Sequence, residues 1–171
     1  WQTVGALFRK KSLIVLFLQG FIGVFPWQVI TFYIFGYLGS GGRGFSDTEV
    51  LMTMVPAVLV MAAGYPVGGM LGDRLFRRTL NGRVFVGAAG VALGAIFLYL
   101  AIRVPYADKL PFIALMCTAS LFIPFAAPNV LSSFYDVTEP EIRATTNAVQ
   151  NFIETIGSAA APLLAGILAA M

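Results

Sequence analysis

The sequence predicts an all-α membrane protein with five transmembrane helices, and two observations support this. First, 58% of the 171 residues are hydrophobic and only 11% are charged, whereas soluble domains carry about 25% charged residues. Second, the charges are bunched, and the apolar runs between them match the ~20 residues that a helix needs to cross a bilayer. Barrel strands would instead show about 10 residues of strict alternation, which these runs lack.

The predicted helices follow the uncharged runs along the chain. They cover about 12–38, 48–72, 83–102, 110–135 and 143–170. The second helix has a start signal, because Ser46 can cap it with Glu49 at the capping-box position. The connection before it is glycine-rich, and the one after the third helix contains two prolines. We expect the five helices to form one incomplete transmembrane domain over 1–171.

The two ends suggest a piece of a longer protein. The chain starts at Trp1, and its last apolar run stops at Met171 without the charged or interfacial flank that usually follows a final helix. We therefore expect further chain on both sides.

The basic residues predict the orientation. Eight of the eleven would lie on the side of the N-terminus, and these are Arg9, Lys10, Lys11, Arg74, Arg77, Arg78, Arg83 and Arg143. Only Arg43, Arg103 and Lys109 would lie on the other side. By the positive-inside rule, the N-terminus of this segment is cytoplasmic, in a multi-pass protein of the cell membrane.

Several function classes are excluded by what the chain lacks. It has no histidine and one cysteine, Cys117, which argues against zinc and haem sites and rules out a Ser/His/Asp arrangement. No phosphate-binding glycine loop is present. The net charge of +3 follows the loops rather than a nucleic-acid surface. We expect no enzyme activity, no cofactor, no metal and no nucleic-acid partner.

The segment Gly69-Met70-Leu71-Gly72-Asp73-Arg74-Leu75-Phe76-Arg77-Arg78 resembles the signature loop of the major facilitator superfamily. That pattern is G-x-L-(small)-D-(R/K)-x-G-(R/K)-(R/K), between the second and third helices of a six-helix half. The departure is Phe76, where the family usually has glycine, so a turn made by a glycine with positive φ is not expected here.

A second segment resembles the same family. The P-E-x-R sequence ending at Arg143 is similar to the family's entry to the fifth helix of a half, and Gly157-x-x-x-Ala161-Pro162-x-x-Ala165-Gly166 is similar to a helix motif described for antiporters. The basic lead-in and the first helix look more like helix seven than helix one. The resemblance implies five helices, seven to eleven, of a C-terminal half, with the N-terminal half and the last helix as partners outside this chain.

The charged loop has two interpretations. Its arginines can serve only as anchors on the cytoplasmic side, as any basic loop would. The resemblance instead implies a conformational latch made by Gly69, Asp73, Arg74, Arg77, Arg78 and Arg143. In that latch Asp73 meets the start of the last helix, where a carboxylate is favoured by the helix dipole, and the arginines pair with acids such as Asp136 and Glu139.

A polar stripe marks the last helix. Its members fall on one helical face and are Asn147, Gln150, Asn151, Glu154 and Ser158. Glu154 lies about 16 Å along the helix from Arg143, near the bilayer midplane, where an ionisable residue suggests a functional site. Three roles are open: a proton carrier, a group that binds a cationic substrate, or a structural partner to an arginine of the other half. The resemblance implies that the stripe faces a central cavity.

Weaker cavity candidates are Gln28 and Thr31 on the first helix and Asn129 on the fourth. Alternatively, each makes an interhelical hydrogen bond, which is the commoner role of a single polar residue in a membrane helix. Gly64, Gly68 and Gly72 repeat every four residues and predict a face for close helix contact.

The resemblance implies secondary active transport of a small solute by alternating access, with symport, antiport and proton coupling all open. One alternative is a non-transporting membrane sensor or scaffold on the same fold. Another is an uncoupled uniporter. In every case the lipid bilayer is a partner.

Overall fold

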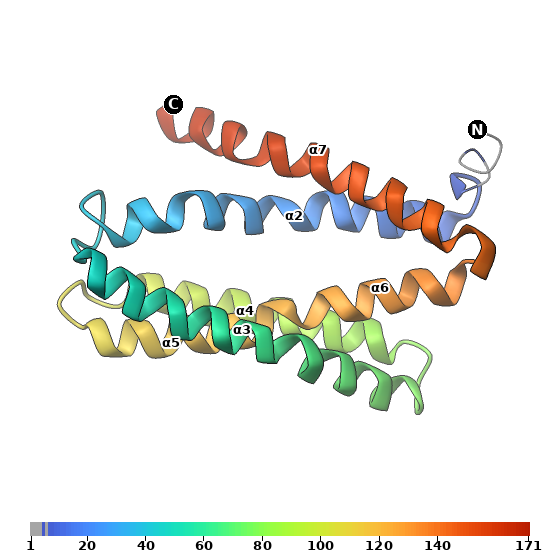
Figure 1. Ribbon diagram of the computed structural model, residues 1–171, viewed down its shortest axis with the longest axis horizontal. Coiled ribbons are helices and arrows are strands. Elements are labelled where there is room, and N and C mark those ends of the chain that lie inside the picture. Colours follow the sequence, from blue (N-terminus) through green and yellow to red (C-terminus); the bar gives the residue numbers. More distant parts are fainter. Residues whose placement is uncertain (1–4, 6) are drawn as a thin grey trace. The chain divides into compact units, whose positions relative to one another are not determined.

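The structure is a computed structural model that describes Gly5 and residues 7–171. Four long helices are α2 (Lys11–Leu38), α3 (Asp47–Phe76), α4 (Gly82–Arg103) and α7 (Arg143–Ala170). A further span combines α5 (Lys109–Phe122), the 3₁₀ turn η1 (Ile123–Phe125) and α6 (Ala126–Val137), and η2 (Pro140–Ile142) leads into α7 (Figure 1). Within the described residues, five segments are long and apolar enough to cross a membrane. The predicted all-α fold class is confirmed, and the described residues contain no strand.

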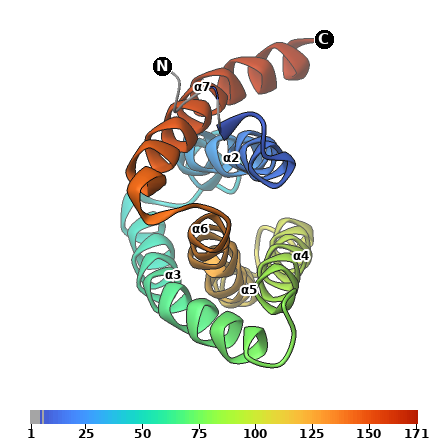
Figure 2. The same cartoon turned by 90° about the vertical axis from the view of Figure 1, so that its right-hand side faces the viewer.

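The contacts divide the chain into two compact units. The first contains Trp1–Gly42 and Phe134–Met171, and the second contains Arg43–Ser133. In the first unit, α2 and α7 run side by side, and α7 leaves α2 towards the end of the chain (Figure 1). In the second unit, α3, α4 and α5 form a three-helix group, which Figure 2 shows nearly end-on.

The second span begins as predicted and ends later. The Ser46 side chain accepts from the Glu49 amide, and the Ser46 amide donates to the Glu49 carboxylate at 3.0 Å, so the capping box is formed. The helix then continues past the expected end at Gly72 to Phe76. The residues from Asp73 to Phe76 include neither glycine nor proline, and arginine and leucine favour helix. Asp73 and Arg74 are therefore helical rather than part of the loop.

The fourth span is interrupted where one continuous helix was predicted. Pro124 lies in η1, and because proline has no backbone N–H it cannot donate to the carbonyl of Ser120. The chain tightens to a 3₁₀ turn at this point, as it commonly does where the α-helical ladder is broken. Helix α6 resumes at Ala126.

The glycines of α3 and α4 pack against this interruption. Gly64, Gly68 and Gly72 are buried, and a methyl group at Gly68 would lie 2.6 Å from Phe125 Cα. On α4, a methyl group at Gly94 would lie 2.8 Å from Ile123 Cγ1. The predicted small-residue face on the second helix therefore lets α3 reach the backbone around η1.

Candidate functional site

Helices α2 and α7 approach each other at two buried glycines. A methyl group at Gly20 of α2 would overlap the amide nitrogen of Gln150 on α7. A methyl group at Gly157 of α7 would lie 2.8 Å from Val24 Cγ2 and 3.1 Å from the carbonyl oxygen of Phe21. Small residues let membrane helices pack closely, so this crossing depends on glycine at both positions.

The crossing encloses two members of the predicted polar stripe. Gln150 is buried, and its Nε2 donates to Oε1 of the half-buried Glu154. Among the described residues, no hydrogen-bond donor reaches Gln150 Oε1. Glu154 stands eleven residues after Arg143, the first residue of α7, or about 16 Å along the helix. The amide and the carboxylate thus form a polar pair in the middle of an apolar span, beside Gly20.

The other members of the stripe have separate surroundings. Asn147 Nδ2 donates to the Tyr135 hydroxyl on α6 at 3.0 Å. Asn151 is exposed. Ser158 is half-buried and lines a groove between α2 and α7. The stripe therefore does not share one environment: Asn147 contacts α6, Gln150 and Glu154 pair at Gly20, Ser158 lines the groove, and Asn151 is exposed.

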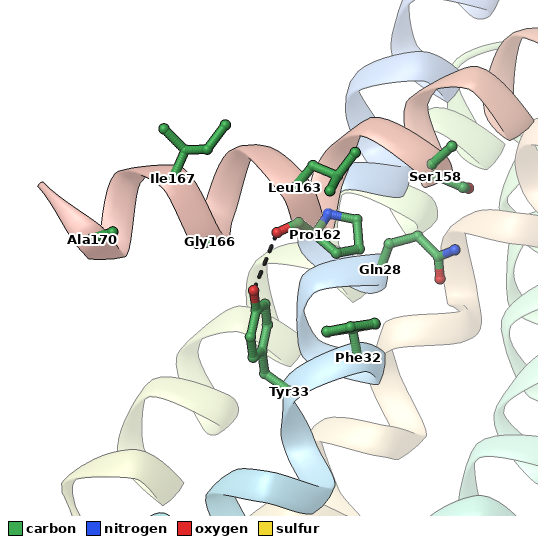
Figure 3. Close-up of a pocket in the computed structure, with 10 residues that line it drawn as sticks. Gln28, Phe32, Tyr33, Ser158, Pro162, Leu163, Gly166, Ile167 and Ala170 are labelled. Atoms are coloured by element: carbon green, nitrogen blue, oxygen red, sulfur yellow. Dashed lines mark hydrogen bonds between the residues drawn. The ribbon is translucent and has the colours of Figure 1, made fainter.

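The groove has a volume of about 770 Å³ and is mainly apolar (Figure 3). Its lining comes from the second half of each helix and consists of Gln28, Phe32, Tyr33, Ser158, Ala159, Pro162, Leu163, Gly166, Ile167 and Ala170. Tyr33 donates its hydroxyl to the carbonyl oxygen of Pro162 at 3.2 Å and bridges the two helices. Because Pro162 has no backbone N–H, it cannot donate a hydrogen bond to the carbonyl of Ser158, one turn earlier in α7.

The remaining cavity candidates make local or packing contacts. Thr31 donates its hydroxyl to the carbonyl of Trp27 on its own helix at 2.9 Å. Asn129 is buried, and its amide nitrogen donates to the carbonyls of Gly68 at 3.0 Å and Phe125 at 2.7 Å. Asn129 also lies where a methyl group on Gly72 would be. Asn129 therefore joins α6 to α3. This is the interhelical hydrogen bond that was the alternative to a role in the cavity.

The charged end of α3 makes a small cluster with the start of α4. Arg83 donates to Asp73 Oδ1 from Nη2 at 2.8 Å and from Nε at 3.1 Å. The guanidinium carbon of Arg83 also lies 4.2 Å from the ring centroid of Phe76. A methyl group at Gly82 would overlap the backbone at Leu75 and Phe76. The residue that departs from the family pattern thus supports the arginine that binds Asp73.

The other predicted latch residues are spread over both units. Arg143 donates Nη2 to the carbonyl of Tyr135 at 3.0 Å, near the end of α6, where the helix dipole favours a cation. Glu139 pairs with Lys10 at 3.7 Å. Gly69, Arg74, Arg77 and Arg78 belong to the second unit, and the three arginines are exposed. A contact between Asp73 and the start of α7 stays a prediction.

Three notable residues were missed by the sequence reasoning. Arg43 was counted only as a loop charge, but its side chain is buried. Tyr33 and Tyr135 make the hydrogen bonds that join α2 and α6 to α7. The glycines around Arg43 indicated special backbone geometry at that loop. No sequence pattern indicated the hydrogen bonds of the three side chains, because their partners belong to other elements of the fold.

The described residues contain no group of three or more His, Cys, Asp and Glu side chains that could hold a metal ion. A family model described as Major Facilitator Superfamily matches residues 1–162. No curated protein and no solved structure matches the chain significantly.

Proposed function

We propose that this chain, which belongs to the major facilitator superfamily, moves a small solute across a membrane by alternating access, coupled to protons. Membership in the family and the five apolar spans make it a multi-pass membrane protein with a transport function. Family members are transporters rather than enzymes. Alternating access, proton coupling and the solute site go beyond family membership, and the residues of α2, α3 and α7 support them as proposals.

The pair of Gln150 and Glu154 is the observation that carries the proposal. A carboxylate in the middle of a membrane span costs about 2.5–3.5 kcal/mol on insertion scales, so an ionisable residue there is a functional-site hypothesis by default. Here it has one amide partner, Gln150 Nε2, and it is only half-buried. We assign Glu154 the role of proton carrier and Gln150 the role of holding its carboxylate against α2.

The groove between α2 and α7 supports a solute site next to this pair. Gln28 and Ser158 provide an amide and a hydroxyl on a mainly apolar surface that also includes Tyr33. Ser158 follows Glu154 by one turn of the same helix. Binding sites for small molecules are mainly apolar with a few placed polar groups. Asn147 and Asn151 belong to the same stripe, and we include them as candidates for solute contact.

The charged end of α3 supports a latch between two conformations. An ion pair with one exposed partner, such as half-buried Arg83 with exposed Asp73, contributes on the order of 1 kcal/mol, whereas moving an equilibrium from 1:99 to 99:1 takes about 5.5 kcal/mol. A latch therefore needs several contacts. We propose that Arg83 holds Asp73 in one conformation, and that Asp73 exchanges it for the start of α7 and Arg143 in the other.

The orientation belongs to the same proposal. With Arg74, Arg77 and Arg78 at one end of the second unit, the positive-inside rule places that end, and the N-terminus of the segment, in the cytoplasm. The cell membrane is the expected location.

The test is solute-dependent proton movement into proteoliposomes that contain a pH-sensitive dye and the full-length protein. A panel of small solutes is added outside, with and without an imposed pH gradient. A change of internal pH that depends on one solute, acidification for symport or alkalinisation for antiport, supports coupled transport. Flux that ignores pH would indicate a uniporter, and no flux for any solute would indicate a sensor or scaffold.

A further inference from the structure

Arg43 is a buried cation in the loop between α2 and α3. Arg43 is only 5% exposed, although charged side chains are almost never fully buried unless they are paired. The adjacent Gly44 has a φ of +70°, which favours glycine. A methyl group on Gly42 would overlap the carbonyl oxygen of Tyr37. The glycines on both sides therefore allow the backbone path that buries Arg43.

Three aromatic rings surround the guanidinium. Its carbon lies 3.9 Å from the ring centroid of Phe112, 5.1 Å from that of Tyr106 and 5.7 Å from that of Phe45. Cations within about 6 Å of a ring centroid, over its face, are attracted by the ring, and the attraction grows when water is excluded.

The guanidinium also donates to two backbone carbonyls just after α4. Nη1 of Arg43 donates to Val104 at 3.2 Å, and Nη2 donates to Pro105 at 2.9 Å. Carbonyls at the end of a helix carry partial negative charge. We call the three rings and these two carbonyls the Arg43 cage.

An ion pair shares the Phe45 ring with the Arg43 cage. Lys109 binds the Glu49 carboxylate, and its Nζ lies 5.3 Å from the ring centroid of Phe45. The Glu49 carboxylate is thus held by Lys109, while rings and backbone dipoles surround Arg43. Among the described residues, no hydrogen-bond acceptor reaches Arg43 Nε.

We propose that the Arg43 cage is a guanidinium-binding site that the chain's own Arg43 occupies, and that this occupancy ties the α2–α3 loop to the α4–α5 loop. A guanidinium group fits because it is planar, stacks on aromatic rings and donates to two acceptors at once, whereas an ammonium group is a compact, strongly hydrated charge. The inference concerns the loop end of the second unit and is independent of the proposed transport function.

Chemical rescue tests the site. Arg43→Ala in the full-length protein should lower the melting temperature in detergent by at least about 2 °C, since the protein loses a desolvated cation–π contact and two hydrogen bonds. Millimolar methylguanidinium should restore the melting temperature of this variant saturably, and n-propylammonium should not. The absence of any recovery, or equal recovery with both cations, would overturn the proposal.

Arg103→Ala is the matched control. Arg103 is exposed, and its guanidinium carbon lies 5.1 Å from the ring centroid of Tyr99 on its own helix. Its loss should shift the melting temperature by less than that of Arg43, with no rescue by methylguanidinium. A rescue as large as that of Arg43→Ala would show a general effect of the cation and contradict a specific site.

Two measurements do not need Arg43→Ala to fold. Arg43→Lys keeps the charge but should still lose most of the stability that Arg43 provides, and full wild-type stability would contradict a site for guanidinium. In the wild-type protein, phenylglyoxal should modify Arg43 at least about tenfold more slowly than Arg103, because the reagent needs the cage to open. Equal rates would show that Arg43 does not occupy the cage.

Discussion

Gly20→Ala tests whether the crossing of α2 and α7 is built around the pair of Gln150 and Glu154. The new methyl group would overlap Gln150 Nε2 and lie 2.9 Å from Glu154 Oε1, so the amide must leave its hydrogen bond. Such a bond in a membrane protein contributes about 0.6 kcal/mol on average and up to about 1.7. Alanine in place of helical glycine gains about 0.5–1 kcal/mol. We expect the free energy of unfolding to change by less than about 1 kcal/mol.

The Gln150→Ala background separates the two effects. In this background the methyl group of Gly20→Ala meets no amide, so the substitution should stabilise the protein by about 0.5–1 kcal/mol. The difference between its effects in the two backgrounds is the coupling energy between the sites, which we expect to be about 1 kcal/mol. Gly36→Ala is the control, because Gly36 lies on the same helix with nothing within 4 Å of the added methyl. The assay is reversible unfolding in mixed micelles. The same effect of Gly20→Ala in both backgrounds would refute the reasoning.

Three further substitutions test other contacts by unfolding in detergent. Phe76→Gly restores the family's glycine, but it removes the ring beneath Arg83 and puts glycine in a helix, so we expect a loss of about 1–2 kcal/mol; unchanged stability would contradict a supporting role for the ring. Asn129→Ala removes two buried hydrogen bonds and should cost about 1–3 kcal/mol, a loss that a residue facing an open cavity would not show. Gly157→Ala pushes a methyl group against Val24 and should cost about 1–3 kcal/mol, unlike the near-neutral change expected for a glycine in open space.

The transmembrane helices were the most predictable part of the fold. A span must be long and apolar because the bilayer core offers no partner to charges or to a free backbone, so the gaps between charges locate the helices. The capping box at Ser46 was predictable because both of its residues are local in sequence. The interruption at Pro124 was not predicted, although proline was visible, because many membrane helices continue through proline, as α2 does at Pro26.

The contacts of individual polar residues were less predictable. The pattern placed Gln150 and Glu154 on one face of a helix, but it could not indicate that Gly20 of α2 lies against them. Arg43 contributed only a charge to the orientation count, and its partners Val104 and Pro105 lie about sixty residues away. Such contacts depend on how helices and loops pack, and helical periodicity carries no information about them.

The most direct test of the central claim compares Glu154→Gln with wild type in proteoliposomes that accumulate the solute identified by the dye assay. Glu141→Gln is the matched control, because Glu141 is an exposed carboxylate in η2, before the start of α7. If Glu154 carries the proton, Glu154→Gln should lose accumulation driven by the pH gradient while solute exchange at equal pH persists, and Glu141→Gln should behave as wild type. Undiminished accumulation by Glu154→Gln would contradict the account.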